Sequence, residues 1–256
     1  MGVIGSRTRK VALIPAGGGG SRFGSELPKQ YADLGGAPMI RRTIDRLATA
    51  LDLDAIHVAI AADDESFDAC VGSVDSEALA GASNSGARLR VLRCGGPTRA
   101  ATVANALAII ATEIDADDWV LVHDAARPCV PVAALRRLVN ELEGDATGGL
   151  LAIPAADTLK RSDGATPPRA LRTEDRSSVW YAQTPQMFRC GLLRSALATN
   201  DALMATDEAQ AIEALAARGE CGWPRLIAGS AQNIKVTYPD DLKLAAAILA
   251  IQGLDA

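Results

Sequence analysis

A glycine-rich stretch, Pro15–Gly24, directly follows a short apolar run and has the residue types of a phosphate-binding loop. Its glycines let the backbone turn sharply and approach a ligand without Cβ contacts, and successive N–H groups in such a turn form a concave anion site. Arg22 can grip a phosphate through its bidentate guanidinium, and Lys29 can add a point charge. We expect these groups to hold a triphosphate; the alternative is that Arg22 and Lys29 are solvated surface charges.

The spacing of the glycines excludes two common phosphate-binding motifs. A GxGxxG dinucleotide fingerprint cannot be placed, because its third required position falls on Arg22 or Phe23. A Walker loop fits Gly19 and Gly24, but Ser25-Glu26 stands where that motif needs Lys followed by Ser or Thr. The loop alone therefore indicates only that the chain binds a nucleotide.

Two further clusters of polar residues and glycines, Gly95–Arg99 and Asp124–Arg127, also follow apolar runs. His123 precedes Asp124, and a His-Asp pair can belong to a metal centre. Such a centre needs further ligands, however, and the only other histidine is His57. Because His123 ends an apolar strand, we expect it to be structural. The five cysteines are scattered without a CxxC pair, so neither a zinc site nor a disulfide framework is indicated.

The elements that must position these clusters alternate between short apolar runs and helical patterns. We expect strands at 10–15, 55–62, 89–94, 119–123 and 149–154, helices at 38–51, 102–112, 131–143 and 239–251, and a further helix opening at 63–65. This alternation predicts an α/β fold of three layers, a mostly parallel sheet with helices on both faces. Ligands of such sheets bind at the carboxyl ends of the strands, where all three clusters fall.

Residues 156–180 interrupt this alternation with a polar, proline-containing stretch that lacks helical periodicity. A segment of this length without regular structure is usually functional, an arm or a lid, and the alternative is a plain surface hairpin. We therefore expect a single domain over residues 1–256, with a protruding β-arm at 156–180.

Composition narrows the class of protein. The chain has 256 residues and a net charge of −5, which argues against a nucleic-acid binder because such proteins normally carry a basic excess. Residues 1–10 are basic but no apolar core follows them, and no apolar run reaches membrane-spanning length, so we expect neither a signal peptide nor a membrane span. We expect a cytoplasmic protein with reduced thiols that contacts neither nucleic acid nor membrane.

Seven motifs, read together, resemble those of one family. In order they are Ala16-Gly17-x-Gly19-x-x-Arg22 with Pro28–Tyr31, Gly95–Leu107, Val122–Pro128, Asp157–Arg161, Gln183–Phe188, Thr206–Glu208 and Asn233–Thr237. The first is similar to the signature loop of nucleotidyltransferases that make sugar and polyol nucleotides. The whole set, from about residue 11 to 249, resembles the 2-C-methyl-D-erythritol 4-phosphate cytidylyltransferases of the non-mevalonate isoprenoid pathway.

The resemblance implies a Rossmann-like nucleotidyltransferase fold and transfer of CMP from CTP to methylerythritol phosphate, with release of pyrophosphate. It implies a Mg²⁺ cofactor near Asp124 and a homodimer formed through the arm. Catalytic roles at the reacting phosphates would fall to Arg22, Lys29 and Lys235. The nucleotide would be bound by Pro15, Ala16, Gly17, Gly18, Gly19, Gly20, Gly95, Gly96, Thr102, Asp124 and Ala125. The acceptor would be bound by Arg127, Thr158, Arg176 and Thr184, with Thr158 and Arg176 on the interlocking arm.

Two departures and two alternatives accompany this hypothesis. Pro97 stands where the family often has an acidic or polar residue, so a base contact there must come from the backbone, and Thr102 replaces a common serine. A sister cytidylyltransferase for ribitol or another polyol phosphate shares most of the motifs, although it more often carries valine at the position of Ala126. A non-catalytic nucleotide sensor on the same fold is disfavoured, because it predicts loss of the phosphate-loop Arg or Lys. Asp157, Asp207 and Glu208 could contact substrate or instead cap a helix or brace the arm.

Overall fold

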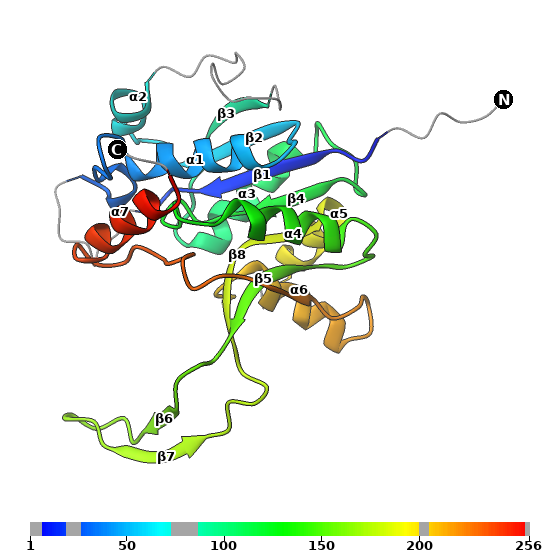
Figure 1. The fold of residues 1–256 in the computed structure, drawn as a ribbon. Helices are drawn as coiled ribbons and strands as arrows, with labels where there is room; N and C mark the ends of the chain where they lie inside the picture. Colours follow the sequence, from blue (N-terminus) through cyan, green and yellow to red (C-terminus); the bar gives the residue numbers. More distant parts are fainter. Residues whose placement is uncertain (1–6, 19–26, 73–86, 200–204, 254–256) are drawn as a thin grey trace.

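The computed structural model describes residues 7–18, 27–72, 87–199 and 205–253 (Figure 1). Its centre is a seven-stranded sheet with the strand order β3-β2-β1-β4-β8-β5-β9. The strands are β1 Lys10–Pro15, β2 Ala55–Ile60, β3 Arg88–Arg93, β4 Trp119–Val122, β5 Gly148–Pro154, β8 Trp180–Arg189 and β9 Arg225–Ala228. Of these, only β8 runs antiparallel to its neighbours, so the mostly parallel sheet is confirmed.

Helices cover both faces of this sheet. They are α1 Met39–Ala50, α2 Ser66–Val71, α3 Arg99–Ile110, α4 Val132–Leu142, α5 Cys190–Leu197, α6 Glu208–Ala217 and α7 Asp241–Ile251, with a short 3₁₀ turn, η1, at Lys29–Tyr31. In β1, Ala12 and Ile14 join the core under α1 and α4, whereas Val11 and Leu13 join the core under α3, α5 and α6. Because successive strand residues point to opposite faces, a strand that is apolar throughout must be buried on both sides. The three-layer α/β fold is confirmed.

Local sequence sets where two of the helices begin. The helix expected at 102–112 starts earlier, at Arg99, because the Thr98 hydroxyl caps it by accepting a hydrogen bond from Ala101 N at 3.1 Å. The acidic residues at 63–65 precede α2, where Asp64 Oδ1 accepts hydrogen bonds from the backbone N–H groups of Ser66 and Phe67. The first of these caps fixes the turn between β3 and α3, which belongs to the site described below.

The arm is a separate two-stranded sheet that projects from the body (Figure 1). Its strands, β6 Leu159–Ser162 and β7 Ala170–Glu174, pair antiparallel. The chain enters the arm after the last residue of β5 and leaves it at the first residue of β8. Its side chains are exposed or only half-buried. The expected β-arm is therefore confirmed as a separate hairpin. Within the described part of the chain, no helix has the length and apolar character needed to cross a membrane.

Candidate active site

A cleft of about 460 Å³ lies at the carboxyl ends of β1, β3 and β4. It is lined by most of the residues that the sequence singled out, namely Pro15, Ala16, Gly17, Gly18, Lys29, Gly96, Thr102, Asp124, Ala125 and Lys235, together with Gln30, Pro97, Thr98, Arg99 and Ala126. Gly19, Gly20 and Arg22 lie outside the described residues. The fold thus brings the three predicted clusters to one place, as the topology of a parallel sheet requires.

The glycines of the cleft allow the loops to pack backbone against backbone. A Cβ on Gly17 would lie 3.0 Å from Gly95 Cα, and a Cβ on Gly95 would lie 2.9 Å from Ala61 Cα. The contact at Gly95 is closer than a Cβ tolerates and the one at Gly17 is tight, so glycine at these positions lets the loops after β1, β2 and β3 pack closely. Thr102 Oγ1 accepts a hydrogen bond from Gly96 N at 3.0 Å and donates to Thr98 O at 3.1 Å, so its hydroxyl braces the same turn.

Asp124 is the one carboxylate among the described residues lining this cleft, and cations surround it. Its Oδ1 accepts a hydrogen bond from Arg99 Nε at 3.0 Å, and its Oδ2 lies 2.8 Å from Lys235 Nζ and 3.7 Å from Arg127 Nε. Burial favours the neutral carboxyl, but Arg99, Lys235 and Arg127 outweigh burial and hold the pKa of Asp124 well below its usual range. The carboxylate is therefore ionised and serves as the centre around which three cations are arranged.

The sequence did not assign a role to Arg99, which the structure places at the hub of this arrangement. Its Nη1 and Nη2 donate to the two carboxylate oxygens of Glu208 at 2.6 and 3.0 Å, while its Nε reaches Asp124. Burial disfavours the charge of Arg99, but the two carboxylates outweigh burial and raise its pKa. Glu208, whose role was open, thus braces Arg99 from the first turn of α6; Asp207 caps that helix by accepting from Gln210 N at 2.9 Å.

Lys29 enters the cleft from η1. Its Nζ donates to Val236 O at 3.2 Å, and Val236 N in turn donates to Ala126 O at 2.9 Å. The next residue, Gln30, is buried and its Nε2 donates to Ala16 O at 3.0 Å. These bonds tie η1 to the glycine loop on one side and to the segment carrying Lys235 on the other. Gln30 was part of a quoted motif, but nothing in its residue type indicated this bracing role.

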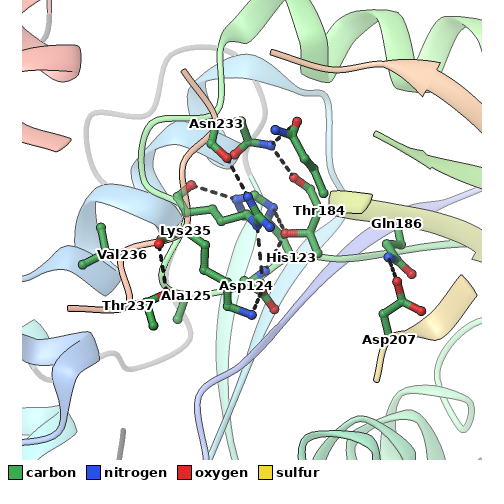
Figure 2. Close-up of polar contacts among 12 residues, drawn as sticks. His123, Asp124, Ala125, Thr184, Gln186, Asp207, Asn233, Lys235, Val236 and Thr237 are labelled. Carbon is green, nitrogen blue, oxygen red and sulfur yellow. Dashed lines mark hydrogen bonds and ion pairs between the residues drawn. The ribbon is translucent and has the colours of Figure 1, made fainter. Parts of the chain in front are cut away.

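A smaller cavity of about 140 Å³ adjoins the cleft and shares Arg99, Asp124 and Lys235 with it. Its other lining residues are Arg127, Ala182, Gln183, Thr184, Gln186, Thr206 and Asp207. Figure 2 shows Asp124, Thr184 and Lys235 converging, with Gln186 and Asp207 forming a separate pair nearby. The Asp124–Lys235 pair therefore stands between two spaces, each lined by cations. Such an arrangement can hold two anionic molecules with their charged ends adjacent.

The predicted acceptor-binding residues fall into two groups. Arg127 and Thr184 line the smaller cavity, whereas Thr158 and Arg176 are exposed on the arm and line neither space. The Thr184 hydroxyl is buried, 3.0 Å from both His123 Nδ1 and Asp124 N. Among the described residues, no group of three or more His, Cys, Asp or Glu side chains gathers as a metal centre would.

Comparisons with known proteins place this geometry in a family. A family model described as 2-C-methyl-D-erythritol 4-phosphate cytidylyltransferase matches residues 10–251. A protein of that name from Azoarcus sp. (strain BH72) is 50% identical over 241 residues, which is 94% of each chain. The one from Dechloromonas aromatica (strain RCB) is 48% identical over 241 residues, 94% of this chain and 97% of its own.

Solved structures agree with the sequence relatives. A crystal structure of a 4-diphosphocytidyl-2C-methyl-D-erythritol synthase has a TM-score of 0.77 at 37% identity and covers 95% of this chain and 99% of its own. The 2-C-methyl-D-erythritol 4-phosphate cytidylyltransferase of Francisella tularensis has a TM-score of 0.72 at 32% identity, covering 94% of this chain and 100% of its own.

Proposed function

The chain belongs to the 2-C-methyl-D-erythritol 4-phosphate cytidylyltransferase family, and on that premise we propose which parts of it carry the reaction. The enzyme transfers CMP from CTP to methylerythritol phosphate and releases pyrophosphate, a step of the non-mevalonate route to isoprenoid precursors. We assign CTP to the cleft of about 460 Å³ and the acceptor to the smaller cavity beside it. The observation that carries this assignment is the Asp124–Lys235 pair, which lines both spaces.

The reaction requires positive charge and correct positioning of the two substrates more than it requires a general base. The acceptor oxygen belongs to a phosphate and is already an anion, so no proton has to be removed from it. The barrier comes from bringing two anions together and from the charge that builds on the leaving pyrophosphate. Lys29 and Lys235, together with Arg22, would offset that charge around the α-phosphorus. Arg127, which lines the smaller cavity, would attract the acceptor phosphate and hold it close to the α-phosphorus.

The carboxylate of Asp124 suits a Mg²⁺ ion, which commonly binds one or two carboxylates plus substrate phosphates. Its two oxygens contact Arg99 and Lys235, and Lys235 is the more exposed of these cations, with 44% of its side chain accessible against 27% for Arg99. We expect Lys235 to turn from Asp124 to a phosphate when nucleotide binds, leaving Oδ2 for the metal. When bound beside Asp124, Mg²⁺ would neutralise part of the charge of the substrate phosphates.

We further propose that the arm completes the site of a second subunit. Thr158 and Arg176 are exposed and line neither cavity of their own chain, although the family resemblance gives them an acceptor-binding role. A two-stranded hairpin is marginally stable by itself, so an arm of this kind gains from packing on another surface. Exposed Leu171 on β7 and the half-exposed Trp180 and Tyr181 at its base offer apolar contact for that packing.

A pyrophosphate-release assay with CTP and Mg²⁺ tests the assignment of substrates. We expect release with methylerythritol phosphate and none above background when the acceptor is omitted. Ribitol 5-phosphate serves as the competing acceptor, because it carries a similar phosphate on a different polyol. Release with ribitol 5-phosphate alone would overturn the acceptor while leaving the nucleotide site intact.

A further inference from the structure

A chain of hydrogen bonds runs through the buried side chains of Thr184 and His123, next to Asp124 (Figure 2). Thr184 Oγ1 lies 3.0 Å from Asp124 N and 3.0 Å from His123 Nδ1, and His123 Nε2 lies 3.1 Å from Arg127 O. Both His123 and Asn233 have no exposed surface, and Thr184 is 4% exposed. The chain therefore connects β8 to the loop after β4, which carries both Asp124 and Arg127.

The donors and acceptors at the two ends of this chain fix its proton positions. Asp124 N–H can only donate, so it occupies an acceptor position of the Thr184 hydroxyl, whose own proton is then directed at His123 Nδ1. Arg127 O can only accept, so His123 Nε2 must carry the hydrogen. The other neutral tautomer would set two acceptors, Nε2 and Arg127 O, against each other at 3.1 Å. One arrangement satisfies every group: a neutral His123 protonated at Nε2.

The backbone of Thr184 is hydrogen-bonded to the segment that carries Lys235, on the other side of the site. Thr184 O accepts a hydrogen bond from Asn233 Nδ2 at 2.8 Å, and Asn233 O accepts one from Arg127 Nη1 at 2.6 Å. Asn233 Nδ2 also reaches Gln183 Oε1 at 3.2 Å. Asn233 lies two residues before Lys235, so one residue of β8 joins the loop of Asp124 to the segment of Lys235. Buried hydrogen-bond networks of this kind restrict the positions of their members.

We propose that Thr184 and His123 are positioning residues that set Asp124 and Arg127 for the reaction. The hydroxyl holds the Asp124 backbone directly and holds the Arg127 carbonyl through His123. This assignment rests on the proposed function of the site and adds a positioning role to the acceptor contact that the sequence predicts for Thr184. It also explains why a histidine stands beside the central carboxylate in a site that needs no general base.

The test compares Thr184→Val, which keeps the shape and removes the hydroxyl, with Thr184→Ser, which keeps the hydroxyl. In Thr184→Val, Asp124 N–H and His123 Nδ1 both lose their buried partner. We expect kcat to fall at least about tenfold, equivalent to about 1.4 kcal/mol, while the KM for CTP stays within about twofold. Thr184→Ser should recover most of the loss. Equal losses in the two variants, or wild-type kcat in Thr184→Val, would overturn the proposal.

A spectroscopic measurement checks the same chain without relying on activity. The chain has two histidines, so in a His57→Leu background the ¹⁵N-imidazole NMR signals belong to His123. We expect the Nε2–H tautomer in that background and in Thr184→Ser, and a changed Nδ1 signal in Thr184→Val. A protonated Nδ1 in the parent protein would contradict the proposal even if Thr184→Val failed to fold. If the substrate assignment failed but this tautomer were found, the fault would lie in the proposed function and not in the hydrogen-bond chain.

Discussion

The cleft and the arm each carry a glutamate held by arginine, yet the two regions use these residues in opposite ways. In the cleft, Glu208 has 1% of its side chain exposed and grips Arg99 with both oxygens. In the arm, Glu174 has 28% of its side chain exposed and pairs with Arg161 and Arg172, whose side chains are about 60% exposed. The first pair is shielded from water, whereas the second is solvated.

The buried pairs of the cleft and the solvated pairs of the arm prepare these two regions differently for a charged ligand. Buried pairs fix Arg99, and through it Asp124, before any substrate arrives, which is the preorganisation that electrostatic catalysis needs. The pairs of the arm are solvated and hold its arginines less firmly. In the dimer that we propose, the cleft is preorganised by its own chain and the arm supplies the remaining acceptor contacts to the partner's cleft.

The largest effect we expect is on stability, from removing the buried carboxylate. Glu208→Ala removes the bidentate partner of Arg99 and leaves it only the contact with Asp124, and breaking a buried ion pair of this kind costs about 3 kcal/mol of unfolding free energy. The matched arm variant, Glu174→Ala, should unfold at the wild-type denaturant midpoint, because solvated pairs contribute little. Urea unfolding measures the unfolding free energy of each variant. Similar losses of unfolding free energy in Glu208→Ala and Glu174→Ala would contradict the distinction between the two regions.

Next comes the loss of catalytic charge in the cleft. We expect Lys29→Ala to lower kcat/KM at least about 10²-fold, or about 2.7 kcal/mol of transition-state stabilisation, because its ammonium would face the phosphates of CTP. Lys243→Ala, which removes a lysine with 87% of its side chain exposed on α7, is the matched control and should keep full activity. Steady-state pyrophosphate release reports both values. Near-normal turnover by folded Lys29→Ala would remove Lys29 from the mechanism.

A smaller effect concerns pH and belongs to the body alone, because residues 156–180 contain no histidine. Burial lowers the pKa of His57 to about 4 from its ordinary 6.5. Between these values the unfolded chain binds a proton that the folded chain does not, so stability falls as pH decreases through this window. From pH 7.5 to 5.0 we expect His57 to account for about 2 kcal/mol of that fall.

The variant that checks this is His57→Leu, which replaces the buried imidazole by an apolar side chain of similar size. His57 Nδ1 is buried and has no hydrogen-bond partner among the described residues, so the substitution should not cost stability at pH 7.5. Its urea unfolding free energy should decline less than that of wild type between the two pH values. An unchanged decline would show that His57 is not the group that titrates.

Sequence patterns predicted the fold well where a local rule decides the structure. Continuous apolar runs such as Val11–Ile14 indicate strands buried on both faces, and glycine after a strand indicates a ligand loop. The insertion of β8 between β4 and β5, antiparallel to both, has no such local signal, because the chain leaves the sheet through the arm and returns later. Strand order of this kind is decided by tertiary packing.

The site was predicted in its parts but not in its connections. Asp124, Lys29 and Lys235 came from their motifs and meet in the cleft. The Arg99–Glu208 pair joins residues 109 positions apart, and no spacing in the sequence indicates such a contact. Thr184 was expected to bind the acceptor, and its residue type cannot reveal that its hydroxyl lies between His123 and Asp124. Residue types indicate chemistry, whereas partners depend on the fold.

The proposed division of labour, in which the arm of one chain completes the cleft of its partner, is tested most directly by pairing two defective chains. Lys29→Ala damages the cleft and Arg176→Ala damages the arm, so each homodimer should be nearly inactive. Co-expressed with different affinity tags and purified through both, the mixed dimer holds one intact cleft facing one intact arm, as two-fold symmetry requires. Our account predicts that this mixed dimer recovers about half of the wild-type activity. A mixed dimer as inactive as its two parents would contradict it.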